Sequence, residues 1–187
     1  KTYLGISISA LILGIFFNAI KGVYALIIGG LPLILGLFYS VKIFPWLPRI
    51  KEVLGAKSLI VASSWALTGS ILPTVTASIR NEKIIFNFLY IFINLLVNTI
   101  IFDIKDIEGD SRAGVKTIPV VLGRGKTIKL LYIINSSLII LLFYALLNPF
   151  FSHFIPILLF ATIYGYLLMH VFGNDVENRL KTEIFVD

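Results

Sequence analysis

The sequence predicts an all-α, multi-pass transmembrane helical bundle, and three observations support this fold class. Hydrophobic residues make up 58% of the 187 residues and charged residues only 14%, and the mean hydropathy of +0.96 lies far above that of soluble domains. Six apolar stretches approach the length of about 20 residues that crosses a bilayer core as a helix. None of them alternates apolar and polar residues as strands of a membrane β-barrel do.

Six spans are predicted, and their connections differ in length. On one side of the bundle the connections are short, comprising residues 21–22, 80–83 and 148–153. On the other side two connections are long and charged, covering residues 40–57 and 103–127. Functional sites are often built on such long connections, so we expect function on that side. The predicted spans cover residues 3–20, 23–39, 58–79, 84–102, 128–147 and 154–172.

The basic residues predict the orientation of the bundle in the membrane. Of the 16 lysines and arginines, all but Lys21, Arg80 and Lys83 fall on the side that carries the long connections. Basic residues gather on the cytoplasmic side of membrane proteins, so this side and both ends of the chain are predicted to be cytoplasmic. The net charge of +6 follows from this bias, and no motif indicates a nucleic-acid partner. With no cysteine, thiolate chemistry is excluded.

The third predicted span is unusual because it is rich in hydroxyl side chains. Two explanations remain open from the sequence. Small hydroxylated residues allow close helix packing and share hydrogen bonds between helices. Polar residues within a span also line cavities and pathways in some membrane proteins. The residues concerned are Ser63, Ser64, Thr68, Ser70, Thr74, Thr76 and Ser78.

The fourth predicted span ends in an acidic run that contains the strongest chemical signal in the chain. Asp103, Asp106 and Asp110 are spaced i, i+3 and i+7, so they share one face if the helix continues. Three carboxylates on one face repel one another unless a cation lies among them, and hard oxygen ligands without histidine or thiolate indicate Mg²⁺, with Mn²⁺ as the alternative. Mg²⁺ is commonly shared with phosphate oxygens, so a phosphorylated ligand is expected.

A simpler interpretation of this region is a solvated loop at the membrane edge. In that case the acids pair with Lys105, Arg112 and Lys116, which the positive-inside bias already explains. The functional interpretation is that basic side chains bind the phosphate that the metal bridges. Both interpretations remain open at the level of the sequence.

Two blocks of residues carry a resemblance to a known family. The first is Asp103-Ile-Lys-Asp-Ile-Glu-Gly-Asp110 with Gly114-Val-Lys-Thr-Ile-Pro-Val-Val-Leu-Gly123 behind it. The second is Tyr39-Ser-Val-Lys42, which precedes a helix that contains Ser63-Ser-Trp65. In order and spacing, these blocks resemble the second aspartate-rich motif, and the preceding Tyr and Lys pattern, of the UbiA superfamily of intramembrane prenyltransferases.

The resemblance implies a bundle of nine helices with two aspartate-rich loops on its cytoplasmic face, each holding Mg²⁺ against a prenyl diphosphate. The first of those motifs has no counterpart in this sequence, and Lys1 corresponds to a position near the third helix of the family. Residues 183–187 resemble the lead-in to the last helix. We therefore expect residues 1–187 to be one prenyltransferase-like domain, incomplete at its N-terminus and at its C-terminus.

The function implied by the resemblance is Mg²⁺-dependent transfer of a prenyl group from an isoprenoid diphosphate to a lipophilic acceptor, aromatic or lipid, within the membrane. No obligate protein partner is expected. The metal ligands are expected to be Asp103, Asp106 and Asp110. Asp106, Asp110 and Lys42 form the expected catalytic set. The prenyl diphosphate is expected to contact Lys116, Tyr39, Arg112 and Asn98. Aromatic faces at Tyr39, Trp65 or Tyr144 could stabilise an allylic cation.

Two other functions remain as alternatives. A divalent-cation transporter could use the acidic run as a loading site, but such a protein should carry ionisable residues near the middle of its spans, where this chain has almost none. A structural membrane subunit could use the acidic loop to dock a partner.

Overall fold

The computed structural model describes residues 2–40, 53–75 and 81–174, and within these residues all regular structure is helical. The predicted all-α fold class is therefore confirmed. The α-helices are α1 (Thr2–Ile20), α2 (Val23–Ser40), α3 (Ala56–Ile71), α4 (Asn81–Lys105), α5 (Ile107–Arg112), α6 (Ile118–Leu122), α7 (Arg124–Leu147), α8 (Pro149–Ser152) and α9 (Ile155–Asn174), with a 3₁₀ turn η2 (Leu72–Val75) after α3.

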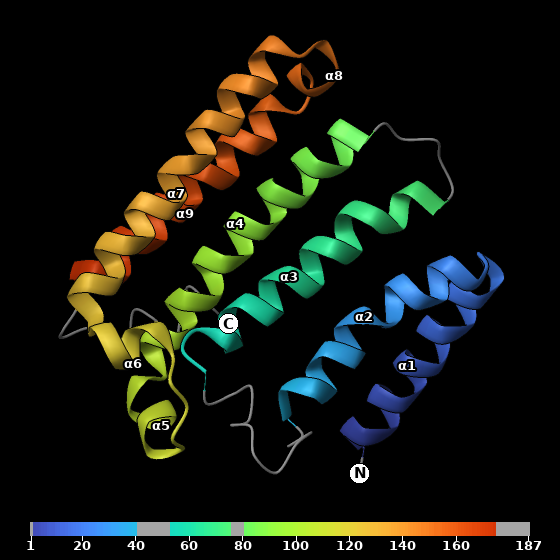
Figure 1. The fold of residues 1–187 in the computed structure, drawn as a ribbon, viewed down its shortest axis with the longest axis horizontal. Coiled ribbons are helices and arrows are strands. Elements are labelled where there is room, and N and C mark those ends of the chain that lie inside the picture. The colour runs from blue at the N-terminus through green and yellow to red at the C-terminus, as the bar shows by residue number, and fades with distance from the viewer. Residues whose placement is uncertain (1, 41–52, 76–80, 175–187) are drawn as a thin grey trace.

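The long helices form a row in which α4 occupies the centre (Figure 1). Helix α4 packs against α3 on one side and against α7 and α9 on the other, while α2 packs on α3 and α1 packs on α2. The short helices α5 and α6 lie at one end of the row, beside the start of α3, and α8 lies at the opposite end (Figure 1). The end that carries α5 and α6 therefore brings the acidic run close to α3.

Three helices are long and apolar enough to cross a bilayer in the part of the chain that the structure describes, namely α4, α7 and residues 155–172 of α9. The apolar stretches Gly5–Ile20 and Val23–Leu37 of α1 and α2 are shorter. Large apolar side chains cover the outer surface of the bundle, and examples such as Ile140 and Phe160 are 72% and 68% exposed. Such surfaces are stable when lipid is the solvent, which agrees with a multi-pass membrane protein.

Helix α3 is shorter than the third span predicted from the sequence, which extended to residue 79. The α-helix ends at Ile71 and continues as the 3₁₀ turn that contains Pro73, a residue without the backbone N–H that would continue the α-helical ladder. The hydroxyls of Ser64 and Ser70 are buried and bond to carbonyls one turn earlier in α3, those of Ile60 and Ala66. The burial of these two small residues supports close packing of α3, and their hydroxyls bond within α3 itself.

The bundle is held together by a core on both sides of α4. One apolar cluster joins α4 to α3, α7 and α9 through residues that include Ile100, Leu131 and Met169, each with no exposed surface. Between α7 and α9, the Asn135 side chain donates a hydrogen bond of 3.1 Å to the Thr162 carbonyl. Gly165 allows this approach, because a Cβ atom there would lie 2.4 Å from Asn135 Oδ1. Small residues at helix interfaces are typical of membrane bundles.

Candidate functional site

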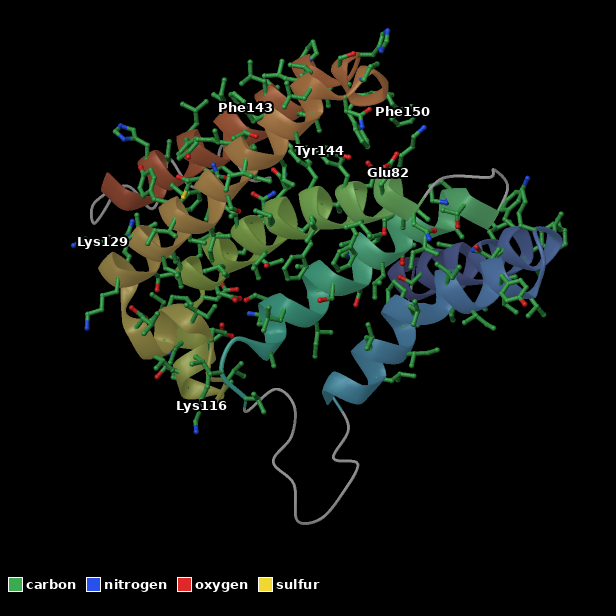
Figure 2. The ribbon with its side chains drawn as sticks, turned by 45° about the horizontal axis from the view of Figure 1, so that its top comes forward. Glu82, Lys116, Lys129, Phe143, Tyr144 and Phe150 are labelled. Carbon is green, nitrogen blue, oxygen red and sulfur yellow. The ribbon has the colours of Figure 1, made fainter. Side chains whose placement is uncertain are left out.

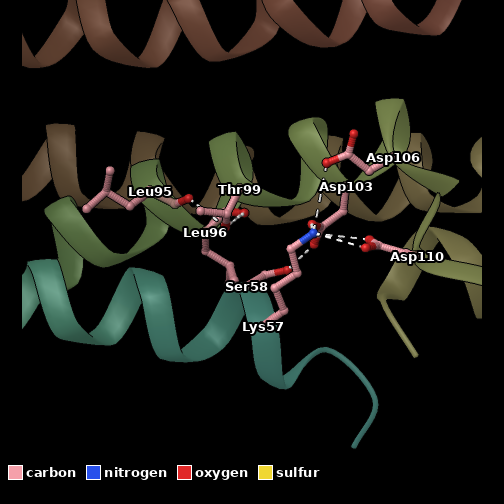
Figure 3. A network of polar contacts seen from close by, with 8 residues as sticks. All are labelled: Lys57, Ser58, Leu95, Leu96, Thr99, Asp103, Asp106 and Asp110. Atoms are coloured by element: carbon pink, nitrogen blue, oxygen red, sulfur yellow. Dashed lines mark hydrogen bonds and ion pairs between the residues drawn. The ribbon is translucent and has the colours of Figure 1, made fainter. Parts of the chain in front are cut away.

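The carboxylates of Asp103, Asp106 and Asp110 converge at the end of the bundle where α4 passes into α5; we call these three residues the acidic cluster (Figure 3). Asp106 is the single residue between the two helices. The helical hydrogen-bond pattern continues through it, because Asp106 N donates to the Phe102 carbonyl at 3.3 Å and Asp110 N donates to the Asp106 carbonyl at 2.8 Å. The helical spacing inferred from the sequence is thus retained across this junction.

The point on which the carboxylates converge is occupied by the ammonium group of Lys57, from the first turn of α3 (Figure 3). Lys57 Nζ lies 2.9 Å from Asp103 Oδ1 and 3.1 Å from Asp110 Oδ2. It also lies 3.3 Å from the second oxygen of Asp110 and 4.0 Å from Asp106 Oδ2. One ammonium group therefore bridges carboxylates that come from two different helices.

Asp103 is buried, with 1% of its surface exposed. Its Oδ2 atom accepts a hydrogen bond of 2.5 Å from the hydroxyl of Ser58, and its Oδ1 atom accepts from Lys57. A buried carboxylate requires such partners because removing an ionised group from water without compensation is strongly unfavourable. Asp103 is therefore not a residue of a solvated loop, as the simpler interpretation of the acidic run had assumed.

Asp110 is held by the backbone that ends α5. Gly114, with φ of +69°, follows the helix, and its N–H donates to the Ser111 carbonyl while Val115 N–H donates to the Asp110 carbonyl. These two bonds form a Schellman motif, in which glycine supplies the left-handed conformation. The Asp110 side chain is 13% exposed, whereas that of Asp106 is 62% exposed. The cluster thus has two carboxylates with fixed surroundings and one, Asp106, that is largely exposed.

Gly55 positions Lys57. The backbone N–H of Gly55 donates a hydrogen bond of 3.0 Å to the Lys116 carbonyl, which ties the start of α3 to the connection between α5 and α6. Gly55 has φ of +70°, and a Cβ atom there would lie 3.2 Å from the Ile118 side chain. Both the backbone conformation and the available space therefore favour glycine at this position.

The charges of the cluster are unbalanced. Three carboxylates surround a single ammonium group, so the formal charges leave an excess of two negative charges. Partial burial lowers the pKa of Lys57, but hydrogen bonds and charge attraction to Asp103 and Asp110 outweigh this effect and raise the pKa above its usual value. Lys57 is therefore a permanent cation near neutral pH, and the cluster still attracts further positive charge.

The donor atoms of the acidic cluster suit a hard divalent cation, since all are carboxylate oxygens. The space between them, however, is filled by the ammonium group of Lys57. Within the described ranges, no three acidic, histidine or cysteine side chains are placed so that they could hold a metal ion as they stand. A metal ion would therefore require the carboxylates to close around it after Lys57 has moved.

The basic residues predicted to lie near the acids point elsewhere. The Lys116 side chain is exposed and points outward from the end of the bundle (Figure 2). Arg112 forms an exposed ion pair of 3.7 Å with Glu108, one turn earlier in α5. Lys105 Nζ lies 5.7 Å from the ring centre of Phe172 in α9. Of these residues, none contributes the cation that bridges the acidic cluster.

Of the remaining predicted site residues, three have described side chains, and none of these contacts Lys57 or the acidic cluster in the part of the chain that the structure describes. Asn98 is half-buried and lines a cavity of about 350 Å³ between α4, α7 and α9. Tyr39 belongs to α2, but its side chain lies outside the described part of the structure, and Lys42 lies outside the described residues. Trp65 is 57% exposed on α3, and Tyr144 lies near α8, at the opposite end of the bundle (Figure 2).

Sequence reasoning did not identify Lys57 and Ser58 as parts of the site. The positive-inside bias explains a lysine at the start of a span equally well, so Lys57 carried no separate signal. Ser58 contacts Asp103, which lies 45 positions later in the chain, and Lys57 contacts Asp110, which lies 53 positions later.

Comparison with protein-family models identifies a family. The family model described as the UbiA prenyltransferase family matches residues 1–185. No curated protein and no solved structure matches the chain.

Proposed function

Because the chain belongs to the UbiA prenyltransferase family, we propose that it transfers a prenyl group from an isoprenoid diphosphate to a lipophilic acceptor, aromatic or lipid, in a Mg²⁺-dependent reaction. Family membership gives the general class, a prenyltransferase integral to the membrane. The observation that carries the more specific proposal is the convergence of Asp103, Asp106 and Asp110 on one point.

The chemistry of the substrate explains why a cluster of carboxylates supports this proposal. A diphosphate is an anion, and carboxylates repel it unless a divalent cation lies between them. When bound by Asp103, Asp106 and Asp110, Mg²⁺ would supply positive charge that favours departure of the diphosphate. Asp103 and Asp110 are held in place by their surroundings, and the exposed Asp106 is available at the edge facing solvent.

The basic and polar residues predicted from the sequence would contact the prenyl diphosphate directly. Lys42 and Lys116 would place ammonium groups near the leaving diphosphate, where negative charge develops. Arg112, Tyr39 and Asn98 complete the proposed contacts to the prenyl diphosphate. The side chains of Lys116 and Arg112 are exposed on the segment that follows the acidic cluster. These contacts therefore require the two side chains to turn toward the bound substrate.

The membrane is a suitable site for this reaction. The prenyl chain of the donor is soluble in the bilayer, and the apolar surroundings limit the access of water to a reactive allylic cation. The distribution of basic residues supports a site on the cytoplasmic side, since the connection that carries the acidic cluster also contains Lys105, Arg112 and Lys116.

The proposal is tested by binding of radiolabelled geranylgeranyl diphosphate to the full chain in lipid nanodiscs, with Mg²⁺ or with EDTA. We expect binding that requires Mg²⁺ and that weakens about tenfold or more in Asp106→Asn, because this change removes a metal ligand without altering side-chain size. Lys129→Met is the matched control, since Lys129 is exposed and points away from the bundle at the same end (Figure 2).

Binding that is unaffected by EDTA and by Asp106→Asn would contradict the proposal. If binding does require Mg²⁺, the release of diphosphate is measured with aromatic and with lipid acceptors, and the acceptor that supports release identifies the acceptor class. Metal-dependent cation flux into liposomes without any prenyl transfer would instead favour a transporter.

A further inference from the structure

We propose that Lys57 is a built-in counter-ion of the acidic cluster, and that a divalent cation binds there by displacing its ammonium group from Asp103 and Asp110. This inference rests on the proposed function, because it concerns the same carboxylates. It assigns to Lys57 the role of a competing counter-ion: the ammonium group balances part of the carboxylate charge before the metal ion arrives.

The geometry makes the two cations mutually exclusive. Lys57 Nζ already lies 2.9 Å from Asp103 Oδ1 and 3.1 Å from Asp110 Oδ2. A Mg²⁺ ion bound to the same two oxygens would lie about 2.1 Å from each of them. On the same side of these oxygens, the ammonium group and the ion would overlap in space and repel each other. Occupation by one cation therefore requires departure of the other.

The surroundings allow the ammonium group to leave without exposing Asp103. The two oxygens of this carboxylate have different partners: Oδ2 accepts the hydrogen bond of Ser58 and Oδ1 contacts Lys57. When Lys57 leaves, Oδ2 remains bonded and Oδ1 becomes available to a new cation. The Lys57 side chain is 32% exposed, so solvent can receive its ammonium group.

The charge of the cluster favours the exchange. With Lys57 in place the formal charges still leave two negative charges in excess. A divalent cation neutralises more of this charge than a single ammonium group does. The displaced ammonium group stays tethered to the first turn of α3, beside the metal ion, where it can approach the oxygens of a bound diphosphate.

The test measures Mn²⁺ binding to the full chain in nanodiscs by electron paramagnetic resonance, without any diphosphate. Removal of the competing cation in Lys57→Met should tighten Mn²⁺ binding about tenfold relative to the unchanged chain. Lys57→Arg, which retains a cation, should not tighten it, and Lys129→Met should leave it unchanged. A purely structural role for Lys57 predicts the opposite, weaker Mn²⁺ binding in Lys57→Met, and this result or an unchanged affinity would overturn the inference.

A second measurement uses the unchanged chain and so does not depend on the folding of a variant. The rate at which an amine-reactive reagent modifies Lys57, followed by mass spectrometry, should increase several-fold on addition of Mg²⁺, with Lys129 as the internal reference. A rate that stays constant or decreases while Mg²⁺ binds would refute displacement and leave the proposed metal site intact. Absence of Mn²⁺ binding in the unchanged chain and in every variant would instead refute both proposals.

Discussion

The hydroxyl of Ser58 donates a 2.5 Å hydrogen bond to the buried carboxylate of Asp103, across the interface between α3 and α4. This contact joins the first turn of one helix to the last turn of its neighbour. It holds one oxygen of the carboxylate in a fixed position and leaves the other to a cation.

We predict that Ser58→Ala lowers the free energy of unfolding by about 1–2 kcal/mol, because one oxygen of a buried carboxylate loses its donor. The measurement is a denaturant titration of the purified protein in mixed micelles. Ser152→Ala is the control, since the Ser152 hydroxyl is exposed and donates to the Pro149 carbonyl within its own short helix, α8. Equal stability of Ser58→Ala and Ser152→Ala would show that the contact with Asp103 contributes nothing.

Two substitutions in the acidic cluster should both weaken metal binding but should differ in their effect on the stability of the fold. Asp103→Asn should lower the free energy of unfolding by about 2–3 kcal/mol, because Lys57 loses its closest carboxylate in a buried setting. Asp106→Asn should change it by less than about 0.5 kcal/mol, since Asp106 is 62% exposed and lies 4.0 Å from Lys57. Both substitutions should weaken Mn²⁺ binding, measured by titration. A larger loss of stability in Asp106→Asn than in Asp103→Asn would contradict the described burial.

Gly55→Ala should destabilise the protein by about 1 kcal/mol or more, because alanine is strained at positive φ and its Cβ would crowd Ile118. Gly125→Ala provides the comparison, since Gly125 lies in α7 and a Cβ atom there would meet nothing within 4 Å. This control should be neutral or slightly stabilising, because alanine favours helix. The measurement is the thermal unfolding midpoint of each variant, which should be lower for Gly55→Ala than for Gly125→Ala. Similar midpoints would contradict the role assigned to Gly55.

Arg112→Ala separates a role in binding from a role in folding. Its ion pair with Glu108 is exposed, so the free energy of unfolding should change by less than about 0.5 kcal/mol. If Arg112 contacts the diphosphate as proposed, the affinity for geranylgeranyl diphosphate should fall about fivefold or more in the presence of Mg²⁺. An unchanged affinity would remove Arg112 from the proposed site.

The extent to which the sequence predicts the structure differs between the fold and the site. Hydropathy locates α4, α7 and α9 within a few residues, because a membrane span is specified by a continuous local property. The predicted span extended eight residues past Ile71, where α3 ends, since the sequence stays free of charge from Pro73 to residue 79.

The convergence of the three aspartates followed from helical spacing, which is also a local property. Their partners could not be derived in this way. The contacts of Lys57 and Ser58 with Asp110 and Asp103 depend on how α3 packs against α4, and a single sequence contains no local signal for that packing. For the same reason the outward direction of Lys116 was not predicted, because a basic residue beside acids could equally face them.

The length of α4 would set how deep in the membrane the proposed site lies. Its 25 residues span about 37 Å, roughly 7 Å more than the hydrocarbon core. Charged residues stand at both ends, Glu82 and Lys105. If the two ends share the excess length, the turn that carries Asp103 would lie at the boundary between acyl chains and headgroups. A diphosphate bound there can remain hydrated while its prenyl chain extends into the bilayer. Lengthening α4 by one turn would move the carboxylates into water, and shortening it would move them into lipid.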